Sequence, residues 1–232
     1  MKKLKITTLV YCLILAINSC GIEKEDKPET QPPVDSVIVT TLKEVTIGNQ
    51  VWTSKNLEVS TYRNGDDIPL VEDAEKWTSL TTGAWCYYEN KTGKGSTYGK
   101  LYNWYAVNDP RGLAPKGYHI PTDAEWTILT TYLGTDAAAK MKSTTGWNED
   151  GNGTNASGFA GLPGGKRYKD VSFIGIGDKG SWWSSSEVSA DLAWSKRDNL
   201  AWGRRLKSDN GFVDDNRDFK KEAGFSVRCL RD

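Results

Sequence analysis

The chain has 232 residues, and its 30 Lys and Arg residues balance its 30 Asp and Glu residues, so its formal net charge is zero. A neutral chain with interspersed charges lacks the basic stripe that nucleic-acid binding requires, so we expect no nucleic-acid partner. No second long hydrophobic segment follows the one at the N-terminus, which argues against further passes through a membrane.

The N-terminal segment has the pattern of a secretory signal. The cationic start Met1–Lys5 precedes an apolar run, Ile6–Ile17, that is too short to span a bilayer as a mature helix. The sequence therefore predicts a signal peptide over residues 1–19. Ile17-Asn18-Ser19-Cys20 resembles the lipobox of bacterial lipoproteins, which implies a diacylated Cys20 and attachment to the outer membrane. The alternative is an ordinary signal peptide with a chance cysteine.

Residues 20–38 are expected to form a flexible tether. They contain three prolines and many charges but almost no large apolar side chain, so they cannot offset their own ordering entropy. The stretch Glu23–Lys27 resembles the surface-export signal of lipoproteins from Bacteroidetes-type bacteria, which implies display on the cell surface. A solvated spacer is the alternative, and the face of the membrane stays open.

Residues 39–232 are long enough for one domain with a sizeable core. All ten tryptophans lie there with most of the 23 glycines, which favours an α+β domain of short strands, few helices and long ordered loops. Glu44–Ile47 and Gln50–Thr53 alternate around Gly48-Asn49, which predicts a β-hairpin. Residues 84–89 predict a strand, and residues 98–107 fit either a strand or a short helix.

A helix is predicted from residue 122 onward. Thr122 and Glu125 form a capping box, an apolar stripe follows, and Gly134 ends the helix. The stripe consists of Trp126, Leu129 and Leu133. Residues 136–143 predict a second helical segment from their alanines. Residues 180–186, 199–204 and 224–229 predict closing strands.

Cys86 and Cys229 are expected to form a disulfide. They remain in an oxidising compartment once Cys20 is committed to lipid, and a bridge would close a long loop, typically worth about 2–4 kcal/mol. Two buried free thiols are the alternative.

A glycine-rich loop at residues 148–155 is a candidate calcium site. Asp150, Asn152 and Asn155 offer the oxygen ligands that calcium prefers, but the spacing is not that of an EF-hand. A glycine-rich ordered loop without metal explains the pattern equally well, and no other cofactor is expected.

Several segments, in order along the chain, resemble the Fibrobacter succinogenes major paralogous domain. They are Val45–Trp52, Asn56-Leu57, Thr61–Asp66, Tyr98–Trp104, Gly117–Trp126, Gly158-Phe159, Leu162–Gly165 and Gly224–Cys229. The resemblance covers nearly all of residues 39–232. The family comes without an established activity, so it implies an envelope protein and not a reaction.

A more distant likeness concerns the fold. Ile120–Trp126 is similar to the Leu-Pro-Thr-Glu-Ala-Glu-Trp signature of the formylglycine-generating enzyme family, and Gly224–Arg228 is similar to its terminal strand. The likeness implies a C-type-lectin-like fold. The motif caps and seats a helix, so it predicts architecture rather than chemistry.

Enzymatic activity is not expected. The copper-dependent relatives use two cysteines a few residues apart near the C-terminus, where this chain has only Cys229. The iron-dependent relatives use several histidines, and the single His119 is interpreted as a hydrogen-bonded structural residue. Two-carboxylate glycosidase chemistry remains open in principle, although no pair is nominated by the sequence.

Binding of a glycan or of a surface partner is the favoured function. Exposed aromatic rings stack on sugars while Asn, Asp and Arg bond hydroxyls, and residues 181–217 carry this mixture. The candidates are Trp182, Trp183, Trp194, Trp202, Arg204, Arg205, Asp214, Asp215, Asn216 and Arg217. For each tryptophan the alternative is a core position, and for Asp214–Asp218 it is a solvated turn. A structural or adhesive protein without a small-molecule ligand remains the competing hypothesis.

Overall fold

The computed structural model describes residues 42–168, 172–189, 199–209 and 211–232, and within them the side chains of residues 216–218 are left aside. The described residues belong to one unit that begins at Thr41. The predicted signal peptide and nearly all of the tether, with Cys20, lie outside the described residues.

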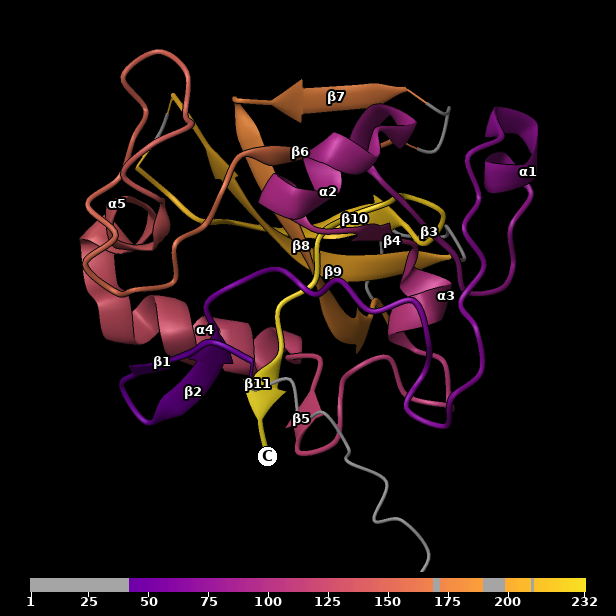
Figure 1. Ribbon diagram of the computed structural model, residues 1–232. Helices are drawn as coiled ribbons and strands as arrows, with labels where there is room; N and C mark the ends of the chain where they lie inside the picture. The colour runs from indigo at the N-terminus through magenta and orange to yellow at the C-terminus, as the bar shows by residue number, and fades with distance from the viewer. Residues whose placement is uncertain (1–41, 169–171, 190–198, 210) are drawn as a thin grey trace, which may run out of the picture. The chain divides into compact units, whose positions relative to one another are not determined.

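Three β-sheets and a few short helices make up the described part of the chain, which confirms the mixed α+β class (Figure 1). The strands are β1 Glu44–Ile47, β2 Gln50–Thr53, β3 Trp85–Cys86, β4 Leu101–Tyr102, β5 Tyr118–His119, β6 Gly164–Arg167, β7 Phe173–Ile176, β8 Lys179–Glu187, β9 Leu200–Lys207, β10 Asp214–Lys220 and β11 Leu230–Arg231. The helices are α1 Ala74–Thr78, α2 Thr92–Tyr98, α3 Trp104–Val107, α4 Asp123–Leu133 and α5 Ala137–Met141, with 3₁₀ turns at Tyr88–Asn90 and Gly134–Asp136. The sheet orders are β1-β2-β11-β5, β10-β9-β8-β6-β7 and β3-β4.

The predicted hairpin is confirmed by antiparallel pairing of β1 and β2. Gly48 turns the chain with a φ of 60°, a conformation that glycine adopts without steric cost. The C-terminal strand β11 then pairs on one side with β2 and on the other with β5, so the two ends of the described chain share one sheet.

The predicted helix is confirmed as α4, with both halves of its capping box in place. Thr122 Oγ1 accepts from the Glu125 amide, and the Glu125 carboxylate accepts from the Thr122 amide at 2.8 Å. The stripe of Trp126, Leu129 and Leu133 is buried, and the helix ends at Gly134. The second helical segment is shorter than predicted, because a 3₁₀ turn occupies its start and α5 ends at Met141.

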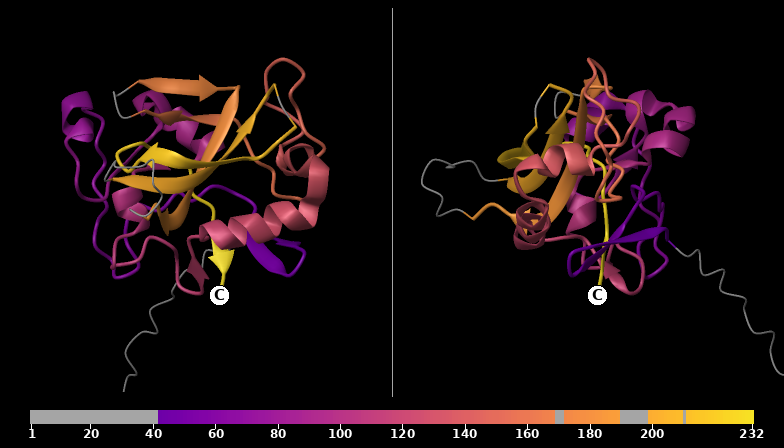
Figure 2. Two further views of the ribbon diagram at one scale, coloured as in Figure 1. Left: turned by 180° about the vertical axis from the view of Figure 1, so that it is seen from behind. Right: turned by 90° about the vertical axis from the view of Figure 1, so that its left-hand side faces the viewer.

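The long strands β8 and β9 divide the core into two main aromatic clusters. Successive side chains of a strand point to opposite faces, so the neighbours Trp182 and Trp183 enter different clusters. Trp182 packs beside Phe159 on the face that α4 covers, whereas Trp183 stacks on Phe225 with ring centroids 4.2 Å apart. Figure 2 shows α4 and α5 together on one side of these strands.

Two strand predictions need correction, and the open choice at residues 98–107 is resolved as a strand followed by a helix. Residues 84–89 form only β3 before a 3₁₀ turn, and residues 98–107 divide into β4 and α3, because the Asn103 side chain caps α3 by accepting from the Ala106 amide. Residues 224–229 are not a regular strand. They cross between sheets: the Phe225 amide donates to Tyr102 O at 3.0 Å, and the Ser226 amide donates to Ser181 O at 3.1 Å.

Around residues 224–229, hydrogen bonds from polar side chains take the place of regular strand-to-strand backbone hydrogen bonds. Asn56 Oδ1 accepts from Trp182 Nε1 at 2.9 Å and from Arg228 Nε at 2.7 Å. Asn56 Nδ2 donates to Tyr98 O at 2.8 Å and to Ser226 Oγ at 3.2 Å. One amide side chain therefore joins four segments that are far apart in sequence.

Asn56→Ala is predicted to destabilise the domain strongly. The substitution leaves the buried Trp182 and Arg228 donors without their acceptor, and we expect a loss of about 2–4 kcal/mol in the free energy of unfolding. Urea denaturation measures it. The matched control is Lys55→Ala at the neighbouring exposed position, expected to change stability by less than about 0.5 kcal/mol. Equal effects of the two substitutions would contradict the role given to Asn56.

Candidate functional site

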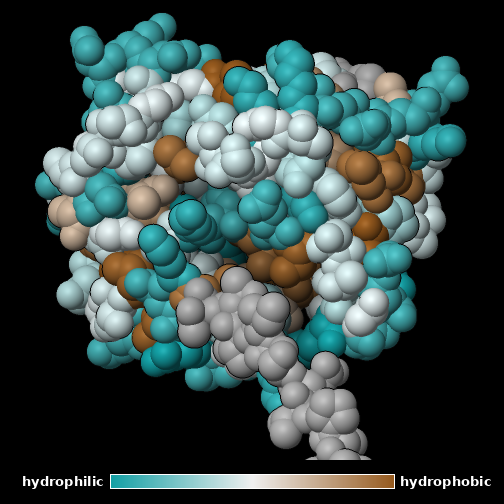
Figure 3. Space-filling view, viewed as in Figure 1, coloured by the Kyte–Doolittle hydropathy of each residue, from teal (hydrophilic) through white to brown (hydrophobic). Residues whose placement is uncertain are grey.

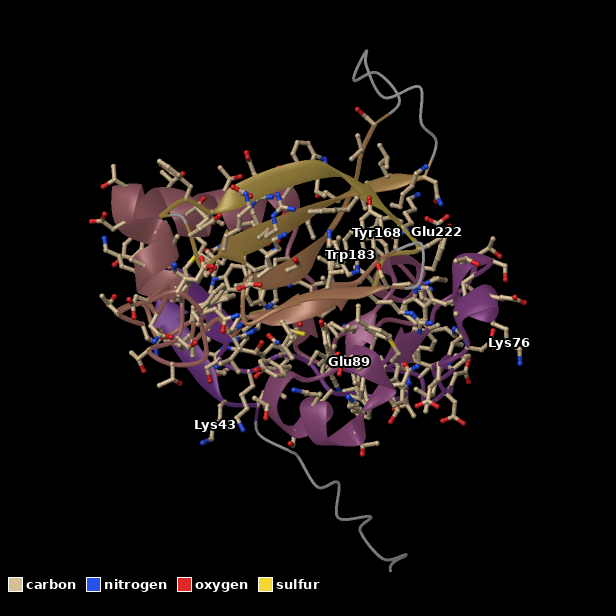
Figure 4. All side chains as sticks on the ribbon, turned by 90° about the horizontal axis from the view of Figure 1, so that it is seen from above. Lys43, Lys76, Glu89, Tyr168, Trp183 and Glu222 are labelled. Atoms are coloured by element: carbon tan, nitrogen blue, oxygen red, sulfur yellow. The ribbon has the colours of Figure 1, made fainter. Side chains whose placement is uncertain are left out.

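Trp182 and Trp183, predicted as ligand contacts, are core residues with 1% and 0% exposure. Their indole N–H groups are used inside the protein, since Trp182 Nε1 donates to Asn56 and Trp183 Nε1 donates to Tyr102 O at 2.8 Å. Figure 4 shows Trp183 among the strands, whereas Lys76 on α1 extends away from the ribbon. The prediction that these two rings stack on a ligand is therefore wrong.

The other two predicted tryptophans give no exposed platform in the part of the chain that is described. Trp202 on β9 is half-buried, and Trp194 lies outside the described residues. Exposure of a tryptophan at residue 194 stays a prediction.

Three of the charged candidates on β9 and β10, Arg204, Arg205 and Asp214, form ion pairs. Arg204 is buried, pairs with Asp123 and donates to Thr127 Oγ1 at 3.1 Å, so it ties β9 to α4 and is not available to a ligand. Arg205 and Lys207 share the Asp214 carboxylate at 3.0 and 2.8 Å. Asp215 is exposed, and the side chains of Asn216 and Arg217 are outside the described ones.

The predicted disulfide is wrong: Cys86 and Cys229 are both free and buried. The two thiols lie in different core clusters, Cys86 beside Trp77 and Leu101, and Cys229 beside Val227 and other residues around Trp183. Burial raises the pKa of Cys86 to about 11 and that of Cys229 to about 12. Both therefore behave as small apolar core residues.

The candidate calcium loop is ordered by its own hydrogen bonds. Asn152 Oδ1 accepts from the Trp147 amide at 3.0 Å, and Asn155 Oδ1 accepts from the Ala160 amide at 2.7 Å. Asp150 is exposed. Among the described residues, no group of three or more His, Cys, Asp or Glu side chains is placed to hold a metal ion. The geometry favours the ordered-loop alternative.

His119 on β5 is hydrogen-bonded through both ring nitrogens. Nδ1 lies 2.7 Å from Asp232 Oδ1, and Nε2 lies 2.9 Å from Glu125 Oε1. Burial of the ring opposes protonation, but the hydrogen bonds to the two carboxylates outweigh it and raise the pKa of His119. The histidine thus couples Asp232 to the capping box of α4, the structural role expected from the sequence.

An open pocket of about 350 Å³ lies where the β1–β2 hairpin, the C-terminal end of α4, α5 and residues 156–157 meet. Its lining residues are Thr46, Ile47, Gly48, Tyr132, Leu133, Lys140, Ala156 and Ser157.

Tyr132 is the exposed aromatic ring of this pocket, with 66% of its surface accessible. The ring lies against Gly48, where an added Cβ would be 3.0 Å from Tyr132 Cδ2. Sequence reasoning missed this residue because it looked for tryptophans. The available signal was an aromatic residue on α4 outside the buried stripe.

Two polar groups beside the ring are held in place by the backbone. Lys140 Nζ donates to Leu133 O at 2.7 Å, and Ser157 Oγ donates to Lys140 O at 2.8 Å. Thr46 adds an exposed hydroxyl on β1. The pocket therefore combines one aromatic face with hydroxyl and ammonium groups on a fixed framework.

The surface seen in Figure 3, apart from its grey atoms, is mainly polar, with separate brown apolar patches. Within the described ranges, no helix has the length and apolar character needed to cross a bilayer.

In the comparison with protein families, the chain matches the Fibrobacter succinogenes major domain over residues 45–231. Neither the comparison with curated proteins nor that with solved structures found a match.

Because Cys86 and Cys229 are free, we predict that dithiothreitol leaves the melting temperature unchanged. We also predict that neither thiol reacts with Ellman's reagent in the native protein, since burial raises the pKa of both. Scanning fluorimetry and thiol labelling with peptide mapping measure this, and denatured protein is the positive control. A melting temperature that falls in the reductant would reinstate the disulfide.

The raised pKa of His119 predicts a pH-dependent contribution to stability. A raised folded-state pKa stabilises fully below the unfolded value, about 6.5, and the contribution disappears as pH rises through the folded-state pKa. The melting-temperature advantage of the wild type over His119→Gln should therefore be largest below about pH 6.5 and should shrink as the pH rises through the raised folded-state pKa of His119. Asp232→Asn is the control, since it removes one carboxylate and should weaken the trend. A pH-independent difference would contradict the coupling.

Proposed function

This chain belongs to the Fibrobacter succinogenes major domain family, and we propose that its domain is a non-catalytic module that binds a glycan at the Tyr132 pocket. We propose further that a lipid on Cys20 holds the domain at the outer membrane, on the cell surface. Two features of the sequence support the location: the Cys20 junction and the charged tether that follows it.

The observation that carries the proposal is the Tyr132 ring. Aromatic rings offer large, rigid, amphipathic contact area at low entropic cost, and the Tyr132 ring presents such a face beside Gly48 at the pocket. An exposed ring beside hydroxyl groups suits the apolar face and hydroxyl edge of a pyranose. The buried tryptophans of β8 do not offer such a face.

The surroundings of the ring support binding rather than turnover. Neither a carboxylate nor a histidine is among the residues that line the pocket. General acid–base work on a glycosidic bond needs two carboxyl groups across the sugar, so the lining suits recognition without cleavage.

The finer fold assignment is also part of the proposal. We propose a C-type-lectin-like architecture, and the long ordered loops, the few helices and the pairing of β11 beside β2 agree with it. Fold alone does not establish function, so the glycan proposal depends on the pocket.

We predict that Tyr132→Ala abolishes glycan binding without unfolding the protein. The full lipidated chain in detergent would be screened on a glycan array, and the affinity for the strongest ligand measured by calorimetry. Loss of the stacking face should weaken binding at least about tenfold.

Ile128→Ala is the matched control, because Ile128 is 55% exposed one turn earlier on α4 and does not line the pocket. Binding that survives Tyr132→Ala would contradict the site. A chain that binds no saccharide would favour an adhesive protein that contacts other proteins.

A further inference from the structure

We infer that the Tyr132 pocket selects an acidic sugar, with Lys140 binding its carboxylate. The inference rests on the proposed glycan function and adds the chemical class of the ligand. Lys140 is the only charged side chain among the residues that line the pocket, and all of those residues are described.

The ammonium group of Lys140 is held in position and still has donors to offer. Its bond to Leu133 O, at 2.7 Å, uses one N–H group. A lysine ammonium has three donors, so two remain for a ligand or for water. A cation that is already immobilised loses less side-chain entropy on binding than a free surface lysine does.

The end of α4 is the main feature that would oppose an anion here, because a helix C-terminus carries partial negative charge. Hydrogen-bond donors within the protein partly compensate this partial negative charge. Lys140 bonds the Leu133 carbonyl, and the Gly134 amide bonds the Thr130 carbonyl. The full positive charge of Lys140 therefore exceeds the residual partial charge of the helix end.

The neighbouring groups complete a recognisable set of contacts. Tyr132 provides a face for the ring, Lys140 a charge-assisted donor, and Thr46 a hydroxyl for a ring substituent. A neutral sugar would use the first and the third of these contacts, and a uronic acid would use all three. The geometry therefore assigns charge selectivity to Lys140 and general affinity to Tyr132.

The test compares trigalacturonic acid with its fully methyl-esterified form, which has the same rings without the charges. Titration calorimetry on the full lipidated chain in detergent should give about tenfold tighter binding of the acid at low salt. The preference should shrink as salt is added, because an exposed ion pair is screened.

Lys140→Met should abolish the preference while leaving the weak binding of the ester. Lys140→Arg should retain part of the preference, and Lys76→Met, at an exposed lysine on α1, should leave it unchanged. The melting temperature of each variant reports folding. If Lys140→Met does not fold, the salt dependence of the wild type still decides the question.

Equal binding of acid and ester, lost in Tyr132→Ala, would overturn the charge selectivity and leave the glycan function standing. A preference for the acid that persists in Lys140→Met would also overturn the assignment. Failure of every saccharide on the array would instead refute the proposed function, and this inference with it.

Discussion

The structure depends on one hydrogen bond, between the buried Arg228 and the half-buried Asn56. Arg228 is 1% exposed, and its guanidinium donates to Thr53 O at 2.7 Å and to Ala160 O at 3.3 Å as well as to Asn56. Burial lowers its pKa to about 9, which expresses the cost of keeping a cation away from water. This energetic cost is offset because residues 224–229 pass from one sheet to another. They form no regular strand pairing there, so the nearby carbonyls need a side-chain donor. Loss of either partner would leave buried donors or carbonyls unpaired.

Two further buried arginines also donate hydrogen bonds to backbone carbonyls of distant segments. Arg167 donates to the carbonyls of Val71, Glu72 and Asp73 and lies 4.3 Å over the Trp77 ring, and Arg204 joins β9 to α4. A planar fork with five donors can serve several carbonyls at once, which a lysine cannot do. The arginine side chains thereby satisfy backbone carbonyls in segments that have no strand partner. Tyr132 lies on α4, whose first half Arg204 joins to β9, and the ammonium of Lys140 bonds the carbonyl of Leu133 near the end of the same helix.

Local features could be predicted from the sequence, and contacts between distant segments could not. The Gly48 turn and the Thr122–Glu125 capping box depend on a few adjacent residues, so their patterns were sufficient. The disulfide prediction failed because compartment and spacing do not say that Cys86 and Cys229 enter different core clusters. The tryptophans of β8 were ambiguous for the same reason, since composition does not distinguish a buried indole from an exposed one. The exposure of Tyr132 follows from its place outside the buried stripe of α4, but its position in a pocket depends on the contact between α4 and the β1–β2 hairpin, which no local pattern predicts.

The family resemblance and the proposed site overlap only in part. Asn56, Trp104 and Arg228, within the segments that carry the resemblance, have their side chains engaged in internal hydrogen bonds. These residues determine the fold, which explains why the motifs predicted architecture without an activity. Thr46, Ile47 and Gly48 line the pocket from such a segment, but Tyr132, Lys140 and Ser157 lie outside all of them. Substitutions at Tyr132, Lys140 or Ser157 could therefore alter the ligand specificity of the pocket without disturbing the internal hydrogen bonds of Asn56 and Arg228.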